Sequence, residues 1–156
     1  RDFCLSRGLG DVYKRQQLYT RLICDEFYGT TPEHGYGYGQ DEDQGQLGAW
    51  YVMAAMGLFD VQGGTNITPS YQIGSPKFRK ITIKLDPRYY SGKTLVIETE
   101  NNAPDHYYVQ SATLNGQPLE DCWFYRREII NGGHLKLQMD STPNTRWGIA
   151  SMPHSK

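Results

Sequence analysis

The pattern of apolar and polar residues divides the chain into a helical first part and a strand-rich second part. Apolar residues recur at helical spacing in residues 17–28, and Gly29 follows where a helix would end. A helix over Gln17–Tyr28 is therefore predicted. A second helix is predicted over Gln46–Met56, with Gly57 as its stop. This second segment is apolar on almost all sides, so we expect it to be covered by more elements than a chain this short provides.

Beyond residue 79 the apolar positions take the alternating period of β-strands. Strands are expected at Lys80–Leu85, Thr94–Thr99, His106–Leu114, His134–Met139 and Trp147–Ala150. Asn115-Gly116 is a two-residue hairpin signal, and residues 126–130 are expected to form a short helical turn. Residues 63–78, rich in glycine and proline, are interpreted as a loop-rich connector. The order predicts an α+β fold: helices within 17–62, five to seven strands, a β-sheet region over 79–150 and a tail over 151–156.

The first 16 residues differ in character from the rest of the chain. They have no sustained period of 2 or 3.6, and residues 8–16 (Gly-Leu-Gly-Asp-Val-Tyr-Lys-Arg-Gln) look like a translated sequencing adapter. We therefore predict that residues 1–16 are not native to the fold and lack sensible packing.

Composition and charge argue against several classes of function for this chain. The net charge is −1, so no basic field supports nucleic-acid binding. No apolar run approaches the roughly 20 residues that a membrane span needs. The three cysteines, Cys4, Cys24 and Cys122, lack metal-ligand spacing and are expected to be free, buried thiols.

The candidate chemistry lies in the polar loop between the two predicted helices. Asp41, Glu42 and Asp43 are adjacent there, and like charges held together raise a pKa, bind a cation or prepare a general base. A structural interpretation is equally open at this point, because Asp43 and Gln46 have the spacing of a capping box. An EF-hand is excluded, because the Gly and Glu that its loop requires are absent.

Several ordered motifs resemble glycoside hydrolase family 92. They are the run Tyr38–Val52 around the acidic residues, Met56–Phe59, Tyr71–Phe78, Gln110–Gly116, Asn131–Gly133, Pro143-Asn144 and Trp147-Gly148. Together they cover residues 17 to 149. The resemblance implies the C-terminal part of an inverting, Ca²⁺-dependent exo-α-mannosidase, and the terminal helices of an (α/α)₆ barrel followed by an antiparallel β-rich region.

The resemblance also implies roles for residues of the acidic loop. An inverting glycosidase uses one carboxylic acid and one carboxylate base that activates water. Carried over by spacing, Asp43 is the general base and Asp41 helps to hold the water, while Glu42 and Gln46 are candidate substrate-binding or supporting residues. The family's general acid is a glutamate upstream of residue 1, and the motif assigns no Ca²⁺ ligand.

The implied partner is an α-mannoside oligosaccharide from N-glycans or mannans, together with the missing N-terminal part of the same enzyme. A bacterial periplasmic or secreted location is expected, with the signal peptide outside these residues. The main alternative is a stand-alone carbohydrate-binding β-domain over residues 79–150, and a third is an interaction fragment without a ligand. The apolar helix over 46–56 favours the barrel, because a binding module has no use for it.

Overall fold

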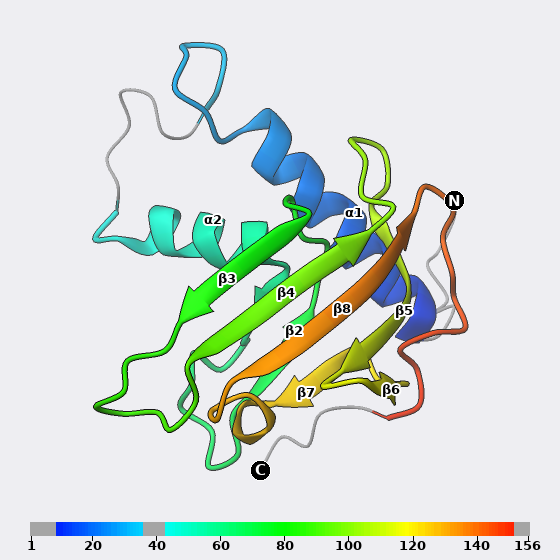
Figure 1. The fold of residues 1–156 in the computed structure, drawn as a ribbon. Coiled ribbons are helices and arrows are strands. Elements are labelled where there is room, and N and C mark those ends of the chain that lie inside the picture. Colours follow the sequence, from blue (N-terminus) through cyan, green and yellow to red (C-terminus); the bar gives the residue numbers. More distant parts are fainter. Residues whose placement is uncertain (1–8, 36–42, 152–156) are drawn as a thin grey trace.

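The first helix is longer than its prediction. The computed structural model describes residues 9–35 and 43–151, in which α1 spans Leu9–Glu26 (Figure 1). It thus begins eight residues before Gln17. Tyr13 is buried in the core, because it lies on the same helical face as Gln17. The prediction of poor packing is therefore wrong for the helical part of this segment, where Tyr13 and Lys14 are buried, while residues 1–8 lie outside the described residues.

The second helix, α2, spans Gln46–Met56 as predicted. It ends at Gly57 in the left-handed conformation (φ 72°), whose N–H donates to the Ala54 carbonyl. Only Ala54 and Ala55 are buried within α2, and Val52 is 55% exposed. The apolar sides of this helix are therefore left partly uncovered by the described residues.

A five-stranded sheet forms the front layer of the molecule (Figure 1). Its order is β3 (Lys80–Lys84), β4 (Thr94–Glu100), β8 (Gly133–Asp140), β5 (Tyr108–Leu114) and β6 (Gln117–Leu119). The expected antiparallel sheet is in fact mixed, because β4 and β8 pair in parallel. The predicted hairpin is confirmed: Asn115 and Gly116 have φ of 53° and 79°, as a primed two-residue turn requires.

A second, three-stranded sheet was not predicted. It consists of β1 (Leu58–Phe59), β2 (Ser70–Ile73) and β7 (Trp123–Tyr125), in the order β1-β2-β7. The supposed connector over 63–78 therefore contains β2, and the described residues form eight strands instead of five to seven. The expected short turn is a 3₁₀-helix over Arg126–Glu128. The strand predicted at 147–150 is wrong, because Gly148 and Ile149 make only isolated bridges to Asp121.

The core lies between the two sheets. Alternate residues of the central strands point inward, and Ile97, Leu135 and Leu137 are almost fully buried with Ile73 and Phe124 of the small sheet. The opposite face of the large sheet carries polar pairs, such as His134 Nε2 with Glu98 Oε2 at 3.0 Å. One face of the large sheet is therefore packed and the other meets solvent.

Helix α1 turns its polar side toward the β-sheets. Lys14, Gln17 and Arg21 are buried, and they share a face at spacings of three and four residues. Gln17 Oε1 accepts from the Val109 N–H at 3.1 Å, and Arg21 donates to the Pro76 carbonyl at 2.5 Å. These bonds fix the position of α1 against the β-sheets.

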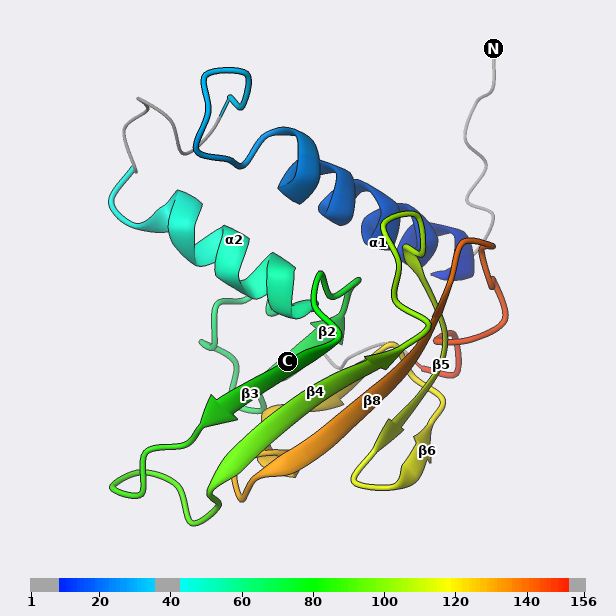
Figure 2. The same ribbon diagram turned by 45° about the horizontal axis from the view of Figure 1, so that its top comes forward.

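The opposite side of α1 carries exposed apolar side chains. Val12 and Tyr19 of α1, and Phe27 just beyond its end, are 46–58% exposed, although burial of such side chains is favourable. α1 and α2 lie beside each other, away from the solvent face of the large sheet (Figure 2). The two helices together therefore present apolar surface that nothing in the described part of the chain covers.

Candidate active site

The acidic loop enters the described part of the structure at Asp43. Asp41 and Glu42 lie outside the described residues, so the convergence of the three carboxylates stays a prediction. Asp43 and Gln46 are both exposed, just before and at the start of α2. The structure therefore places the proposed base where water can reach it.

The backbone leading into α2 is unusual. Asp43, Gln44 and Gly45 have φ of 55°, 60° and 87°, so three consecutive residues are left-handed. Such a conformation costs about 1–2 kcal/mol for a residue with a side chain, although Asp tolerates it better than most. Strain of this kind gathers at functional sites. Because it sets the direction of the Asp43 side chain, this run is part of the candidate site.

The capping interpretation of Asp43 is wrong. The N-cap of α2 is Gly45, and no side chain caps the helix. The Asp43 carbonyl, not its carboxylate, accepts from the Gln46 N–H at 3.2 Å. The left-handed run moves Asp43 two residues away from the capping position. Within the described residues, the Asp43 carboxylate is therefore not engaged in a cap.

Three aromatic rings join the two ends of the acidic loop. The Tyr28 ring, two residues beyond α1, stacks on Trp50 with centroids 5.4 Å apart, and its centroid lies 5.0 Å from that of Tyr51. The Tyr28 hydroxyl donates to the Leu47 carbonyl at 3.2 Å. Sequence reasoning missed Tyr28, because its partners lie 19 to 23 residues away and no local period connects them.

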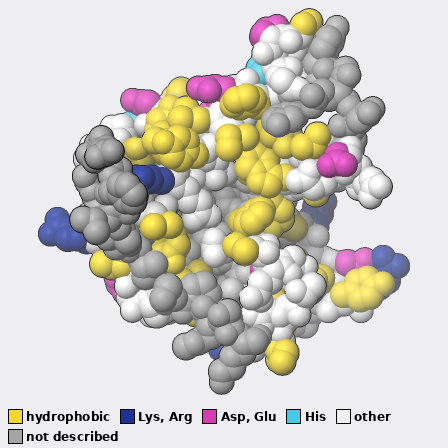
Figure 3. Space-filling model, turned by 180° about the vertical axis from the view of Figure 1, so that it is seen from behind, with side chains coloured by type: hydrophobic (Ala, Val, Ile, Leu, Met, Phe, Trp, Pro, Cys, Tyr) yellow, Lys and Arg dark blue, Asp and Glu magenta, His cyan; other side chains and the backbone are white. Residues whose placement is uncertain are grey.

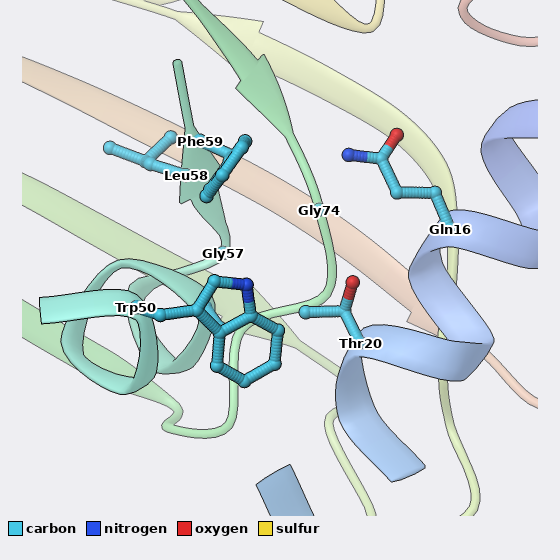
Figure 4. Close-up of a pocket in the computed structure, with 8 residues that line it drawn as sticks. Gln16, Thr20, Trp50, Gly57, Leu58, Phe59 and Gly74 are labelled. Atoms are coloured by element: carbon cyan, nitrogen blue, oxygen red, sulfur yellow. The ribbon is translucent and has the colours of Figure 1, made fainter. Parts of the chain in front are cut away.

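A hollow of about 220 Å³ opens between the two helices (Figure 4). Gln16 and Thr20 of α1 face Trp50 of α2 across it, and it extends toward Gly57 and Gly74. The described residues that line it carry no titratable side chain, so they offer stacking and hydrogen bonding but no acid–base group. Asp43, the described residue of the acidic loop, lies at the opposite end of α2 from Gly57.

Three described titratable groups near α1 have strongly shifted pKa values. Burial lowers the pKa of Lys14 to about 8, and burial raises the pKa of both Cys24 and Cys122 to about 11. These two cysteines are free and buried, as predicted, while Cys4 lies outside the described residues. The shifted groups belong to the interface between α1 and the β-sheets, where they affect stability more directly than catalysis.

No three His, Cys, Asp or Glu side chains come together within residues 9–35 and 43–151 as a metal site would require. Neither described helix has the length and apolar character needed to cross a membrane.

Hydrophobic side chains gather on the face seen from behind, where α1 and α2 lie (Figure 3). Val12 and Tyr19 of α1 and Val52 of α2 are each more than half exposed, so both helices contribute open apolar side chains.

Comparison with known proteins gives consistent results. The model of the "Glycosyl hydrolase family 92 catalytic domain" matches residues 10–141. An uncharacterized secreted glycosidase of Arthroderma benhamiae is 32% identical over 137 residues, which is 86% of this chain and 16% of that protein.

Two solved structures from Bacteroides thetaiotaomicron are also similar. One is a family GH92 inverting mannosidase of strain VPI-5482, with 39% identity and a TM-score of 0.75 over 90% of this chain and 18% of that one. The other is a family GH92 alpha-mannosidase, with 28% identity and a TM-score of 0.74 over 88% of this chain and 18% of that one. The chain thus spans less than a fifth of the length of these relatives.

Proposed function

Because the chain belongs to glycosyl hydrolase family 92, we propose that it is the C-terminal part of an inverting exo-α-mannosidase acting on α-mannosides of N-glycans or mannans. One observation carries this proposal: the catalytic-domain match runs from residue 10 to residue 141 and so includes the acidic loop. The 39% identity to an inverting mannosidase supports the stereochemistry.

In this proposal Asp43 is the general base. An inverting enzyme needs an ionised carboxylate that takes a proton from water while the water attacks the anomeric carbon. The exposed Asp43, held in a strained backbone before a helix, suits that role. Asp41 holds the same water, and Glu42 and Gln46 support the substrate or the carboxylates. The general acid comes from the missing upstream part.

The open helix faces support a larger catalytic domain. α2 is apolar but mostly half-exposed, and α1 exposes Val12 and Tyr19 on the side away from the sheets. Further helices of an (α/α)₆ barrel would bury these faces, at about 25 cal/mol per Å² of apolar area. The small share of the relatives' length that the chain spans is consistent with a missing N-terminal part.

Calcium is proposed as the cofactor on the family resemblance alone. Ca²⁺ takes six to eight oxygen ligands and would help to bind sugar hydroxyls. The described residues supply no cluster of this kind, so no step of the mechanism is derived through the ion. Loss of activity on chelation of the full-length enzyme, and recovery with Ca²⁺ but not with Mg²⁺, is the expected result. Full activity in EDTA would contradict it.

A secreted or periplasmic location is also proposed. The Arthroderma benhamiae relative is described as secreted. Because polymeric and protein-linked mannosides are extracellular substrates for many organisms, such a location would suit the proposed activity. Recovery of the full-length protein in the periplasmic or culture fraction tests it, and retention in the cytoplasm would contradict it.

The alternative of a binding module over residues 79–150 has a structural difficulty. Tyr13, Leu58 and Ile73, which all precede residue 79, are part of the same core as β4, β5 and β8. Strand β7 also pairs with β2, from the supposed connector. A segment over 79–156 would expose this core and is expected to be insoluble. A soluble, sugar-binding segment would favour the alternative.

The direct test is hydrolysis of α-1,2-mannobiose by the full-length enzyme, followed by ¹H NMR. We expect β-mannose as the first product, because inversion converts the α-linkage to the β-anomer. The 156-residue chain alone is expected to be inactive, because the general acid is missing. Initial α-mannose would contradict inversion, and turnover by the isolated chain would contradict the assignment of the acid.

A further inference from the structure

The contacts of Tyr28 connect the end of α1 to the beginning of α2 across the acidic loop. Its hydroxyl donates to the carbonyl of Leu47, which lies only four residues after Asp43. Its ring packs on Trp50 and Tyr51, one turn further along α2. A single side chain thus contacts three residues in the first six of the helix.

The first turn of α2 has no side-chain cap, and it is preceded by three left-handed residues. The backbone bonds from the Gln46 N–H to Asp43 and from the Ala49 N–H to Gly45 both lie within the same short segment. The contacts of Tyr28, in contrast, attach this turn to the segment that follows α1.

A second set of contacts, through Tyr51 and Lys77, also links the start of α2 to α1. Tyr51 lies under the Lys77 ammonium, which is 5.8 Å from the ring centroid. Lys77 in turn pairs with Asp25 of α1 at 2.5 Å. The chain of contacts therefore starts at Tyr28, two residues beyond α1, passes through α2 and Lys77, and reaches α1 at Asp25. Such a closed set of contacts restrains both the distance and the rotation of the helix start.

We propose that Tyr28 is a positioning residue that holds the first turn of α2, and with it the carboxylate of Asp43, in its catalytic place. Tyr28 acts through Leu47 and the α2 backbone. The proposal rests on the proposed function for its catalytic meaning, whereas the mechanical coupling stands on the contacts alone. Displacement of a catalytic group by about 1 Å can cost about 100-fold in rate, so a loosened turn has a measurable effect.

The first test uses the 156-residue chain itself. Tyr28→Phe keeps the ring contacts and removes the hydrogen bond to Leu47. We expect amide hydrogen exchange at Gln46 and Ala49 to become about three- to tenfold faster, the factor that corresponds to one hydrogen bond, with β4 and β8 amides unchanged. Tyr28→Leu removes the ring contacts too and should accelerate exchange further. Unchanged exchange at Gln46 and Ala49 in both variants overturns the proposal.

The second test measures kinetics in the full-length enzyme. Tyr28→Phe is expected to lower kcat about tenfold while KM stays within twofold and the acidic limb of the pH profile keeps its position. The matched control is Tyr90→Phe, which removes the hydrogen bond from Arg126 at 3.1 Å, outside α1 and α2, and should leave kcat unchanged.

The outcomes are distinguishable. Faster exchange with an unchanged kcat overturns the positioning role and leaves Tyr28 a structural residue. A fall in kcat of the same size in both Tyr28→Phe and Tyr90→Phe also overturns it. A wild-type enzyme without mannosidase activity refutes the proposed function, but the exchange experiment still decides whether Tyr28 holds the helix start.

Discussion

Replacement of Gly57 by alanine tests the junction between α2 and the β-sheets. Gly57 is left-handed, and an added Cβ would lie 2.5 Å from Pro76 Cγ and 2.7 Å from the Pro76 nitrogen. Pro76 is almost fully buried, and the neighbouring Lys77 N–H is bonded to the Ala55 carbonyl at 3.0 Å. The proline therefore has little freedom to move away.

Two destabilising effects add when Gly57 is replaced by alanine. A left-handed alanine costs about 1–2 kcal/mol, and overpacking of a fixed neighbour costs about 1–3 kcal/mol. Gly57→Ala should thus lower the free energy of unfolding by about 2–5 kcal/mol. With a urea m-value of about 2 kcal/mol/M, the midpoint would fall by about 1–2.5 M.

Gly45→Ala is the matched control. Gly45 is also left-handed, with φ 87°, but a Cβ there meets no atom of the described residues within 4 Å. Only the conformational cost applies, so its midpoint should fall by about 0.5–1 M. Urea unfolding of both variants, followed by circular dichroism, measures the difference. Equal midpoints for the two variants would refute the steric argument.

Two further predictions concern the interface between α1 and the β-sheets. Lys14 is 3% exposed and its ammonium has no hydrogen-bond partner among the described residues, so Lys14→Met should stabilise the chain by about 1–3 kcal/mol at pH 7. The pKa of Lys14 in the folded chain is about 8, below its ordinary value of 10.5, so the wild type regains stability as the pH rises from 8 to 10.5. The difference in free energy of unfolding between the wild type and Lys14→Met should therefore narrow over this range. A constant difference would contradict this prediction. Cys24 and Cys122 should resist a thiol reagent at pH 8 until the chain unfolds, because both are buried and burial raises the pKa of each to about 11. Rapid labelling of either cysteine in the native chain would contradict this, because it would show that the interface between α1 and the β-sheets opens.

Local signals predicted the elements that depend on local chemistry. The bounds of α2 follow from its apolar run and from Gly57, and the hairpin follows from Asn115-Gly116. Strands β3, β4 and β8 follow from alternation over five or more residues. In each case the residues that determine the structure are neighbours along the chain.

Elements that depend on distant partners were missed. β1 and β2 have two and four residues, too few to show a period, and β2 is completed by pairing with β7 some 50 residues away, where Ser70 lies opposite Tyr125. The parallel pairing of β4 with β8 is likewise determined by tertiary contacts between segments that are distant in the sequence. The early start of α1 was missed because its first turns bury Lys14 and Gln17, which no amphipathic pattern would place inside.

For the candidate site, the sequence located the acidic loop but not what holds it. The capping-box spacing left open that Asp43 caps the helix, whereas three left-handed residues place the cap at Gly45. The contact of Tyr28 with Leu47 joins a residue just beyond α1 to one on α2, 19 positions away, so no spacing rule finds it. Backbone conformation and contacts between elements therefore supplied what residue types alone could not.

The proposed function depends above all on Asp43 as the general base. The most direct test of this role is the kcat of Asp43→Asn in the full-length enzyme. The substitution preserves size and removes the ionised carboxylate, so kcat should fall at least about 10²–10⁴-fold while the circular dichroism spectrum stays unchanged. Glu42→Gln, a matched change in the same loop, should have a much smaller effect. A kcat near that of the wild type in Asp43→Asn would show that another group activates the water.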